Sequence, residues 1–130
     1  MTWPVPVDEL GDRINLKNDR ISSSDSERQL RTVAAVLQRL AIQPGIVLAD
    51  EVGMGKTFVA LGVAMMAALS DRGRRPVVVM VPSSLHQKWP RDFKVFRALA
   101  ITREQDKILR HASADSALEF FRLMDKKASE

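Results

Sequence analysis

Apolar positions along the chain first repeat with the period of a helix. Between residues 24 and 40 they recur every three or four positions, which predicts a helix with one apolar face. Ser24 or Asp25 can cap the first turn of this helix. Residues 58–70 are apolar almost throughout and predict a second helix, and residues 117–124 predict a further amphipathic one.

Two short runs lack the helical period and predict strands. Residues 46–49 are apolar, and residues 76–81 are rich in valine, as in a strand buried on both faces. With the helix at 58–70 between them they predict a βαβ unit, whose two strands are parallel. Pro82 ends the second run, and Pro90 is expected to kink or split the helix that follows, near Trp89. The predicted fold class is therefore α/β, with a short parallel sheet flanked by helices.

The most specific chemistry lies between the first strand and the second helix. Residues 48–57 read Leu-Ala-Asp-Glu-Val-Gly-Met-Gly-Lys-Thr. The glycines let the backbone turn tightly and bring its N–H groups to an anion. Lys56 supplies a positive charge, and Thr57 supplies a hydroxyl that can ligate Mg²⁺. The segment predicts a phosphate-binding loop (P-loop) for ATP or GTP, placed at a helix N-terminus.

The loop departs from the usual spelling G-x-x-x-x-G-K-[ST], because Asp50 stands where the first glycine is expected. One alternative is an ordinary glycine-containing turn. Another assigns residues 46–51 to the acidic segment that holds Mg²⁺ in such enzymes. The order of strand, glycine turn, Lys-Thr and helix favours phosphate binding over both alternatives.

Composition bounds the class of protein. The 130 residues predict one small domain, divided into an irregular lead-in at 1–23 and a body at 24–130. The absence of cysteine excludes disulfides, thiolate catalysis and cysteine metal sites. No apolar run is long enough to span a membrane and the N-terminus does not resemble a signal peptide, so a cytoplasmic protein without a membrane partner is expected. The net charge of +4 is compatible with a polyanion partner without requiring one.

Three segments together resemble the Swi/Snf class of superfamily-two helicase-like ATPases. The loop at 48–57 resembles the first motif of that class, in which an Asp-Glu pair commonly stands where other P-loops begin with Gly. Residues 79–93 are similar to the next motif, a strand ending in Pro and followed by a Leu, a Trp and an acidic-aromatic pair. Gln29 stands 27 residues before Lys56, much like the adenine-reading glutamine of such enzymes. The resemblance covers roughly residues 27–97.

This resemblance implies the N-terminal part of a first RecA-like ATP-binding lobe, with ATP and Mg²⁺ as its ligands. Lys56 would lie between the β- and γ-phosphates and stabilise the charge that develops there during transfer. Thr57 would hold Mg²⁺, and Gln29 would hydrogen-bond to the adenine edge. For Gln29 the alternative is a polar residue on a solvated helix face. The implied nucleotide-binding residues are Gln29, Val52, Gly53, Met54, Gly55, Lys56 and Thr57.

The resemblance also implies a nucleic-acid partner, with DNA as the expected one. The strand of nucleic acid would run along Pro82, Ser83 and Ser84, whose polar groups would contact its phosphates. Trp89 and Phe93 are spaced by four residues, which is more simply explained by a helix face packed on the sheet than by base stacking.

Two parts that hydrolysis requires in this class are missing from the 130 residues. No apolar strand ending in Asp-Glu follows residue 97, because residues 120–125 have a helical pattern, and there is no room for a second lobe with its arginine finger. We therefore expect the ATP-binding portion of a Swi/Snf-like DNA helicase or translocase, inactive in hydrolysis without the missing helicase lobes. The alternative is a small stand-alone module that binds nucleotide or a partner. A P-loop kinase or GTPase fits the Asp-Glu loop poorly.

Overall fold

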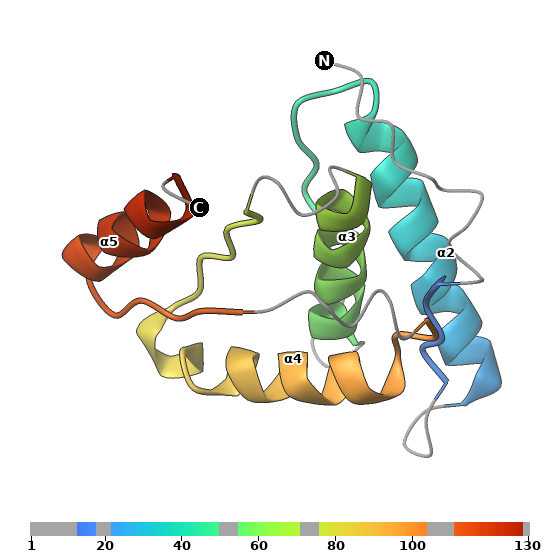
Figure 1. The fold of residues 1–130 in the computed structure, drawn as a ribbon. Helices are drawn as coiled ribbons and strands as arrows, with labels where there is room; N and C mark the ends of the chain where they lie inside the picture. The colour runs from blue at the N-terminus through green and yellow to red at the C-terminus, as the bar shows by residue number, and fades with distance from the viewer. Residues whose placement is uncertain (1–12, 18–21, 50–54, 71–75, 104–110, 129–130) are drawn as a thin grey trace.

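Within the residues that the computed structural model describes, the chain is built from helices (Figure 1). The described residues are 13–17, 22–49, 55–70, 76–103 and 111–128. In chain order the elements are α2 (Ser23–Leu40), α3 (Lys56–Ser70), the 3₁₀ turn η2 (Ser83–Leu85), α4 (Lys88–Leu99) and α5 (Ala117–Ala128). Figure 1 shows α2 and α3 side by side, with α4 crossing at one end of α3. The helix α5 lies apart from α2 and α3 in the same view.

The predicted parallel sheet is not formed by the described residues. Residues 46–49 and 76–82 belong to no strand. The one β-bridge recorded in the described part of the chain is isolated and antiparallel, and it joins Ile14 to Ile101. The prediction of an α/β fold, an incomplete P-loop (RecA-like) lobe with a short parallel sheet, is therefore wrong, and the described fold is helical.

The strand prediction failed because a strand depends on more than its own sequence. A run of β-branched residues favours a pleated, half-buried surface, but a strand also needs a neighbouring strand with which to form hydrogen bonds. Among the described residues neither run has such a neighbour, and the side chains of Val47 and Met80 are 90% and 91% exposed. Two strands alone also bury too little apolar surface to be stable.

The helix α2 forms where the helical period predicted it. The hydroxyl of Ser22 accepts a hydrogen bond from the N–H of Asp25 at 3.1 Å, so the cap lies two residues before Ser24, the earlier of the two predicted caps. Asp25 in the first turn and Arg39 in the last complement the helix dipole. The buried residues are spaced by three or four, as one helix face requires, and they are Ser26, Gln29, Val33, Val36 and Leu37.

The helix α3 is the centre of the structure, and its composition explains why. Apart from Lys56, Thr57 and Ser70, its residues are apolar or small, and a helix that is apolar on all sides is stable only when it is covered. It packs against both α2 and α4. At Gly62 an added Cβ would lie 3.1 Å from Cγ2 of Val33, so this glycine allows α2 and α3 to approach closely.

One hydrophobic core joins these helices to the chain before α2. Ile14 and Leu16 are buried in it, and the N–H of Asn15 donates to the carbonyl of Ala100 at 2.7 Å. The ring of Phe96 is fully buried and meets Phe58 edge-on, with ring centroids 5.8 Å apart. The buried core residues are Ile14, Leu16, Val33, Leu37, Val59, Leu61, Met65, Met66, Phe96, Ala100 and Ile101.

The helix α4 contains Pro90 without being broken by it. The chain forms η2, turns at residues 86–87 and begins α4 at Lys88, so the interruption falls just before Trp89, close to the predicted break. Pro90 then lies in the first turn, where a backbone N–H has no partner within the helix. Trp89 and Phe93 pack against the core of helices, and not on the predicted sheet.

The helix α5 follows a contact between two side chains that ties its entrance to the rest of the chain. Nε2 of His86 lies 2.9 Å from a carboxylate oxygen of Asp115. The side chains of Leu118 and Phe121 on α5 are exposed. Across the described helices, none combines the length and apolar character that crossing a membrane requires.

Candidate functional site

The described part of the predicted phosphate-binding loop is the turn that enters α3. Gly55 has a φ of 77°, a left-handed conformation that glycine adopts without the strain of a Cβ. Its carbonyl accepts hydrogen bonds from the N–H groups of Phe58 and Val59, both at 3.1 Å. Gly55 therefore turns the chain and accepts the first bonds of the helix. The predicted residues Val52, Gly53 and Met54 lie outside the described residues.

The start of α3 concentrates positive charge. Lys56 is its first residue, and its first turn holds no acidic residue. A helix N-terminus carries the positive end of the helix dipole, so a cation there is unfavourable by about 0.3–1 kcal/mol. Two positive features therefore lie at one helix end, and both attract an anion. The arrangement fits a phosphate group, which the backbone N–H groups of a helix N-terminus also bind.

Thr57 has a neighbour that the sequence did not indicate. Nζ of Lys88 donates a long hydrogen bond to Oγ1 of Thr57, at 3.4 Å, and pairs with the carboxylate of Asp92 one turn further along α4. Lys88 lies 31 residues from Thr57 in sequence, and the packing of α4 against α3 brings them together. The site therefore holds a second lysine and a carboxylate beside the hydroxyl predicted to bind Mg²⁺.

Gln29 lies on the buried face of α2, against the turn. Its side chain is only 5% exposed, so it does not lie on a solvated helix face. A Cβ added at Gly55 would lie 2.0 Å from Nε2 of Gln29, which means that the amide group and the glycine are in direct contact. Within the described part of the chain, Oε1 of Gln29 has no hydrogen-bond partner. A buried acceptor without a partner costs about 1–3 kcal/mol, so its retention here calls for an explanation.

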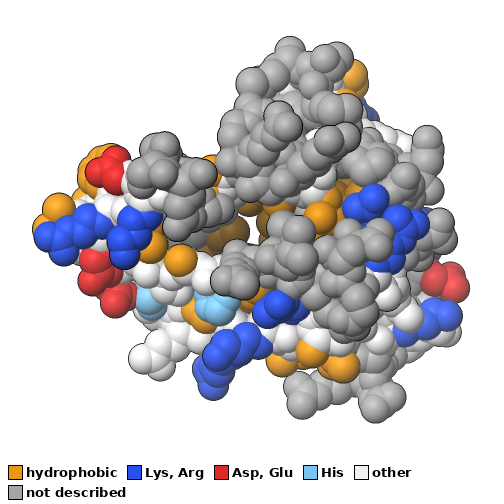
Figure 2. All heavy atoms as spheres, in the orientation of Figure 1, with side chains coloured by type: hydrophobic (Ala, Val, Ile, Leu, Met, Phe, Trp, Pro, Cys, Tyr) orange, Lys and Arg blue, Asp and Glu red, His pale blue; other side chains and the backbone are white. Residues whose placement is uncertain are grey.

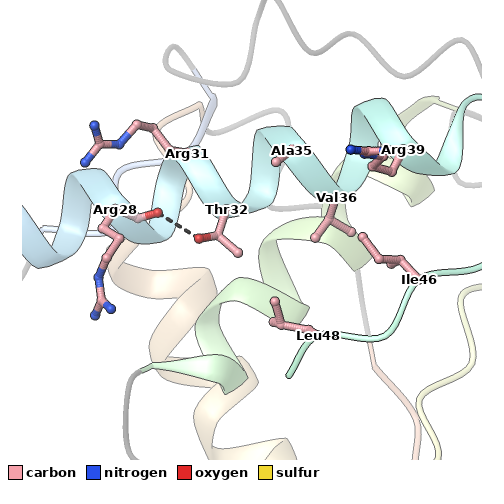
Figure 3. Close-up of a pocket in the computed structure, with 8 residues that line it drawn as sticks. All are labelled: Arg28, Arg31, Thr32, Ala35, Val36, Arg39, Ile46 and Leu48. Atoms are coloured by element: carbon pink, nitrogen blue, oxygen red, sulfur yellow. Dashed lines mark hydrogen bonds between the residues drawn. The ribbon is translucent and has the colours of Figure 1, made fainter. Parts of the chain in front are cut away.

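A separate groove of about 390 Å³ is lined by α2 and by the extended segment that follows it (Figure 3). Arg28, Arg31 and Arg39 contribute from α2, and Ile46 and Leu48 contribute from the extended segment. Its lining includes none of the predicted nucleotide-binding residues, so it is distinct from the turn at Gly55.

The predicted nucleic-acid residues lie at another groove, of about 450 Å³. Ser83 and Ser84 line it, and Pro82, which precedes η2, is exposed. The lining of this groove does not include residues 55–57. On the face drawn in Figure 2, the basic side chains gather in separate groups and not in one continuous band.

Comparison with known proteins gives a partial match. Residues 28–111 match the profile of the SNF2-related domain. The proteins named RNA polymerase-associated protein RapA from Actinobacillus pleuropneumoniae serotype 5b (strain L20) and serotype 3 (strain JL03) are each 42% identical to this chain over 69 residues. The match covers 53% of this chain and 7% of each of these curated relatives. No solved structure matches the chain significantly.

Proposed function

Because the chain belongs to the SNF2-related domain family, we propose that its turn at residues 55–57 binds the phosphates of Mg·ATP. The observation that carries this proposal is the start of α3, where Lys56 stands at the positive end of the helix dipole with no acidic residue in the first turn. The parent protein is then an ATP-dependent DNA helicase or translocase, and this chain is its ATP-binding portion.

Each residue of the turn takes one role in this proposal. The ammonium of Lys56 binds the β- and γ-phosphates, and the left-handed turn at Gly55 lets the backbone approach them. The hydroxyl of Thr57 ligates Mg²⁺. The Lys88 ammonium donates to that hydroxyl, so Mg²⁺ binding would displace this hydrogen bond and leave Lys88 paired with Asp92 or with a phosphate oxygen.

We further propose that these 130 residues bind ATP without efficient hydrolysis. Hydrolysis in this class needs a carboxylate pair at the end of a further strand to hold Mg²⁺ and orient water. Residues 117–128 form the helix α5, so they do not provide that strand.

The proposed partner of the parent protein is DNA, contacted through Pro82, Ser83 and Ser84. The exposure of these three residues and the net charge of +4 support this. The relatives are named as RNA polymerase-associated, which makes RNA polymerase a second candidate partner of the parent protein.

A second candidate function is a stand-alone module that binds a partner polypeptide. One observation favours it: the extended segments 46–49 and 76–80 expose large apolar side chains, which a partner would cover. Nucleotide binding separates the two candidates, because the module needs no nucleotide.

A titration with nucleotides of decreasing phosphate number tests the proposal. We expect the full chain to bind Mg·ATP more tightly than ADP. AMP should bind at least about tenfold more weakly than ATP, because each charge-assisted hydrogen bond to a lost phosphate contributes about 1.5–3 kcal/mol. The measurement is isothermal titration calorimetry, repeated with EDTA to remove Mg²⁺. Equal affinity for AMP and ATP, or no binding by a folded sample, would contradict the phosphate site and favour the partner-binding module.

A further inference from the structure

The contact between Gln29 and Gly55 joins two segments that are distant in sequence. Gln29 lies on α2, and Gly55 lies in the turn before α3. An added Cβ at Gly55 would lie 2.0 Å from Nε2, 2.7 Å from Cδ and 3.3 Å from Oε1 of Gln29, so the whole amide group faces the glycine. Glycine is therefore required at position 55 for two reasons, its left-handed φ and the space that the amide occupies.

Burial makes this amide an unusual element of the core. Glutamine is mostly exposed in folded proteins, yet Gln29 is 5% exposed and stands on the same helix face as Val33 and Leu37. Its Oε1 has no hydrogen-bond partner within the described residues. An apolar side chain of similar size would fill the same space without an unpaired acceptor, so packing alone does not account for a glutamine here.

We propose that Gln29 is the positioning residue of the phosphate-binding turn, holding Gly55 in its left-handed conformation and thereby fixing the start of α3. This inference rests on the proposed function of the turn. The amide presses on Gly55 from the core side, and the carbonyl of Gly55 anchors the first bonds of α3 at Phe58 and Val59. Gln29 therefore acts on Lys56 and Thr57 through the backbone and needs no contact with the base of the nucleotide.

This role differs from the adenine reading that the resemblance implied, and the two roles have different signatures. A residue that reads adenine separates ATP from GTP and does not affect a ligand that has no base. A residue that positions the turn affects every triphosphate alike. Inorganic tripolyphosphate, which carries the phosphates without a base, is therefore the decisive probe.

The test uses the full chain with the substitution Gln29→Ala, which removes the amide and its contact with Gly55. We expect the affinities for Mg·ATP, Mg·GTP and tripolyphosphate to fall by the same factor, about tenfold, because the turn that orders the phosphates loses the contact that holds it. The matched control is Gln38→Ala, at an exposed position of the same helix, which should leave all three affinities unchanged. Circular dichroism verifies that both variants are folded.

Three outcomes separate the possibilities. Loss of affinity for ATP alone would overturn the positioning role and support adenine reading. Unchanged affinity for all three ligands would overturn the positioning role and leave the proposed function intact. No binding of any ligand by the wild-type chain would overturn both.

A double-mutant cycle tests the contact itself without any ligand. Gly55→Ala should lower the melting temperature through both the left-handed φ and the collision with Gln29, whereas in a Gln29→Ala background only the first cause remains. We therefore expect Gly55→Ala to lower the melting temperature less in the Gln29→Ala background than in the wild type. Additive effects would show that the amide does not hold the turn, and would overturn the inference even if every variant folds.

Discussion

Replacing Lys56 by alanine is expected to weaken the binding of Mg·ATP by about 10- to 100-fold. Hydrogen bonds to charged groups contribute about 1.5–3 kcal/mol, and each 1.4 kcal/mol corresponds to tenfold in affinity. Lys56 is the first residue of α3, where its ammonium and the helix dipole act on the same bound anion. Calorimetric titration of the variant against Mg·ATP measures the effect.

Lys94→Ala is the matched control for this prediction. It removes the same charge from an exposed position of α4, so it accounts for any general effect of net charge on a nucleotide with several negative charges. We expect its affinity to stay within about twofold of the wild type, since a surface charge interacts weakly through water. Equal weakening by the two substitutions would mean that ATP is attracted by overall charge and not by the turn.

Replacing Phe96 by alanine is expected to lower the free energy of unfolding by about 3–5 kcal/mol, the usual effect of removing a buried aromatic ring. The free energy of unfolding of a domain is only about 5–15 kcal/mol, so this substitution would remove a large share of it. The ring is fully buried and meets Phe58, which directly follows Thr57 on α3. Urea denaturation followed by circular dichroism measures the loss.

Val95→Ala is the control for the loss of the ring. Val95 precedes Phe96 on the same helix and is 45% exposed, so we expect a loss of less than about 1 kcal/mol from its truncation. If the two substitutions destabilised the chain equally, α4 would not be packed on α3 through Phe96. The proximity of Lys88 to Thr57 depends on the same packing and would then be in doubt.

The helices could be predicted because their signals are local. Apolar residues spaced by three or four placed α2 at 24–40, against the observed Ser23–Leu40, and the apolar run at 58–70 lies within α3, Lys56–Ser70. The strands could not be predicted in the same way. A strand requires a partner elsewhere in space, and the valine-rich run at 76–81 carries no information on whether that partner is present.

The turn that enters α3 could be predicted from contiguous residues, and its binding of phosphate stays a prediction. The glycines and Lys-Thr placed the loop at residues 50–57 and the helix from residue 58, whereas α3 begins at Lys56. Two features depend on packing between segments far apart in the sequence, and no sequence signal could have shown them. One is the approach of Lys88 to Thr57, and the other is the burial of Gln29 beneath Gly55.

The most direct test of the phosphate site is the map of backbone amide shifts when Mg·ATP is added to the ¹⁵N-labelled full chain. We expect saturable changes that are largest at Gly55, Lys56 and Thr57, since the bound phosphates would lie against these amides. Amides of α5 should remain unchanged. Changes centred on the arginine-lined groove of α2, at Arg28, Arg31 and Arg39, with none at Gly55 to Thr57, would contradict the account.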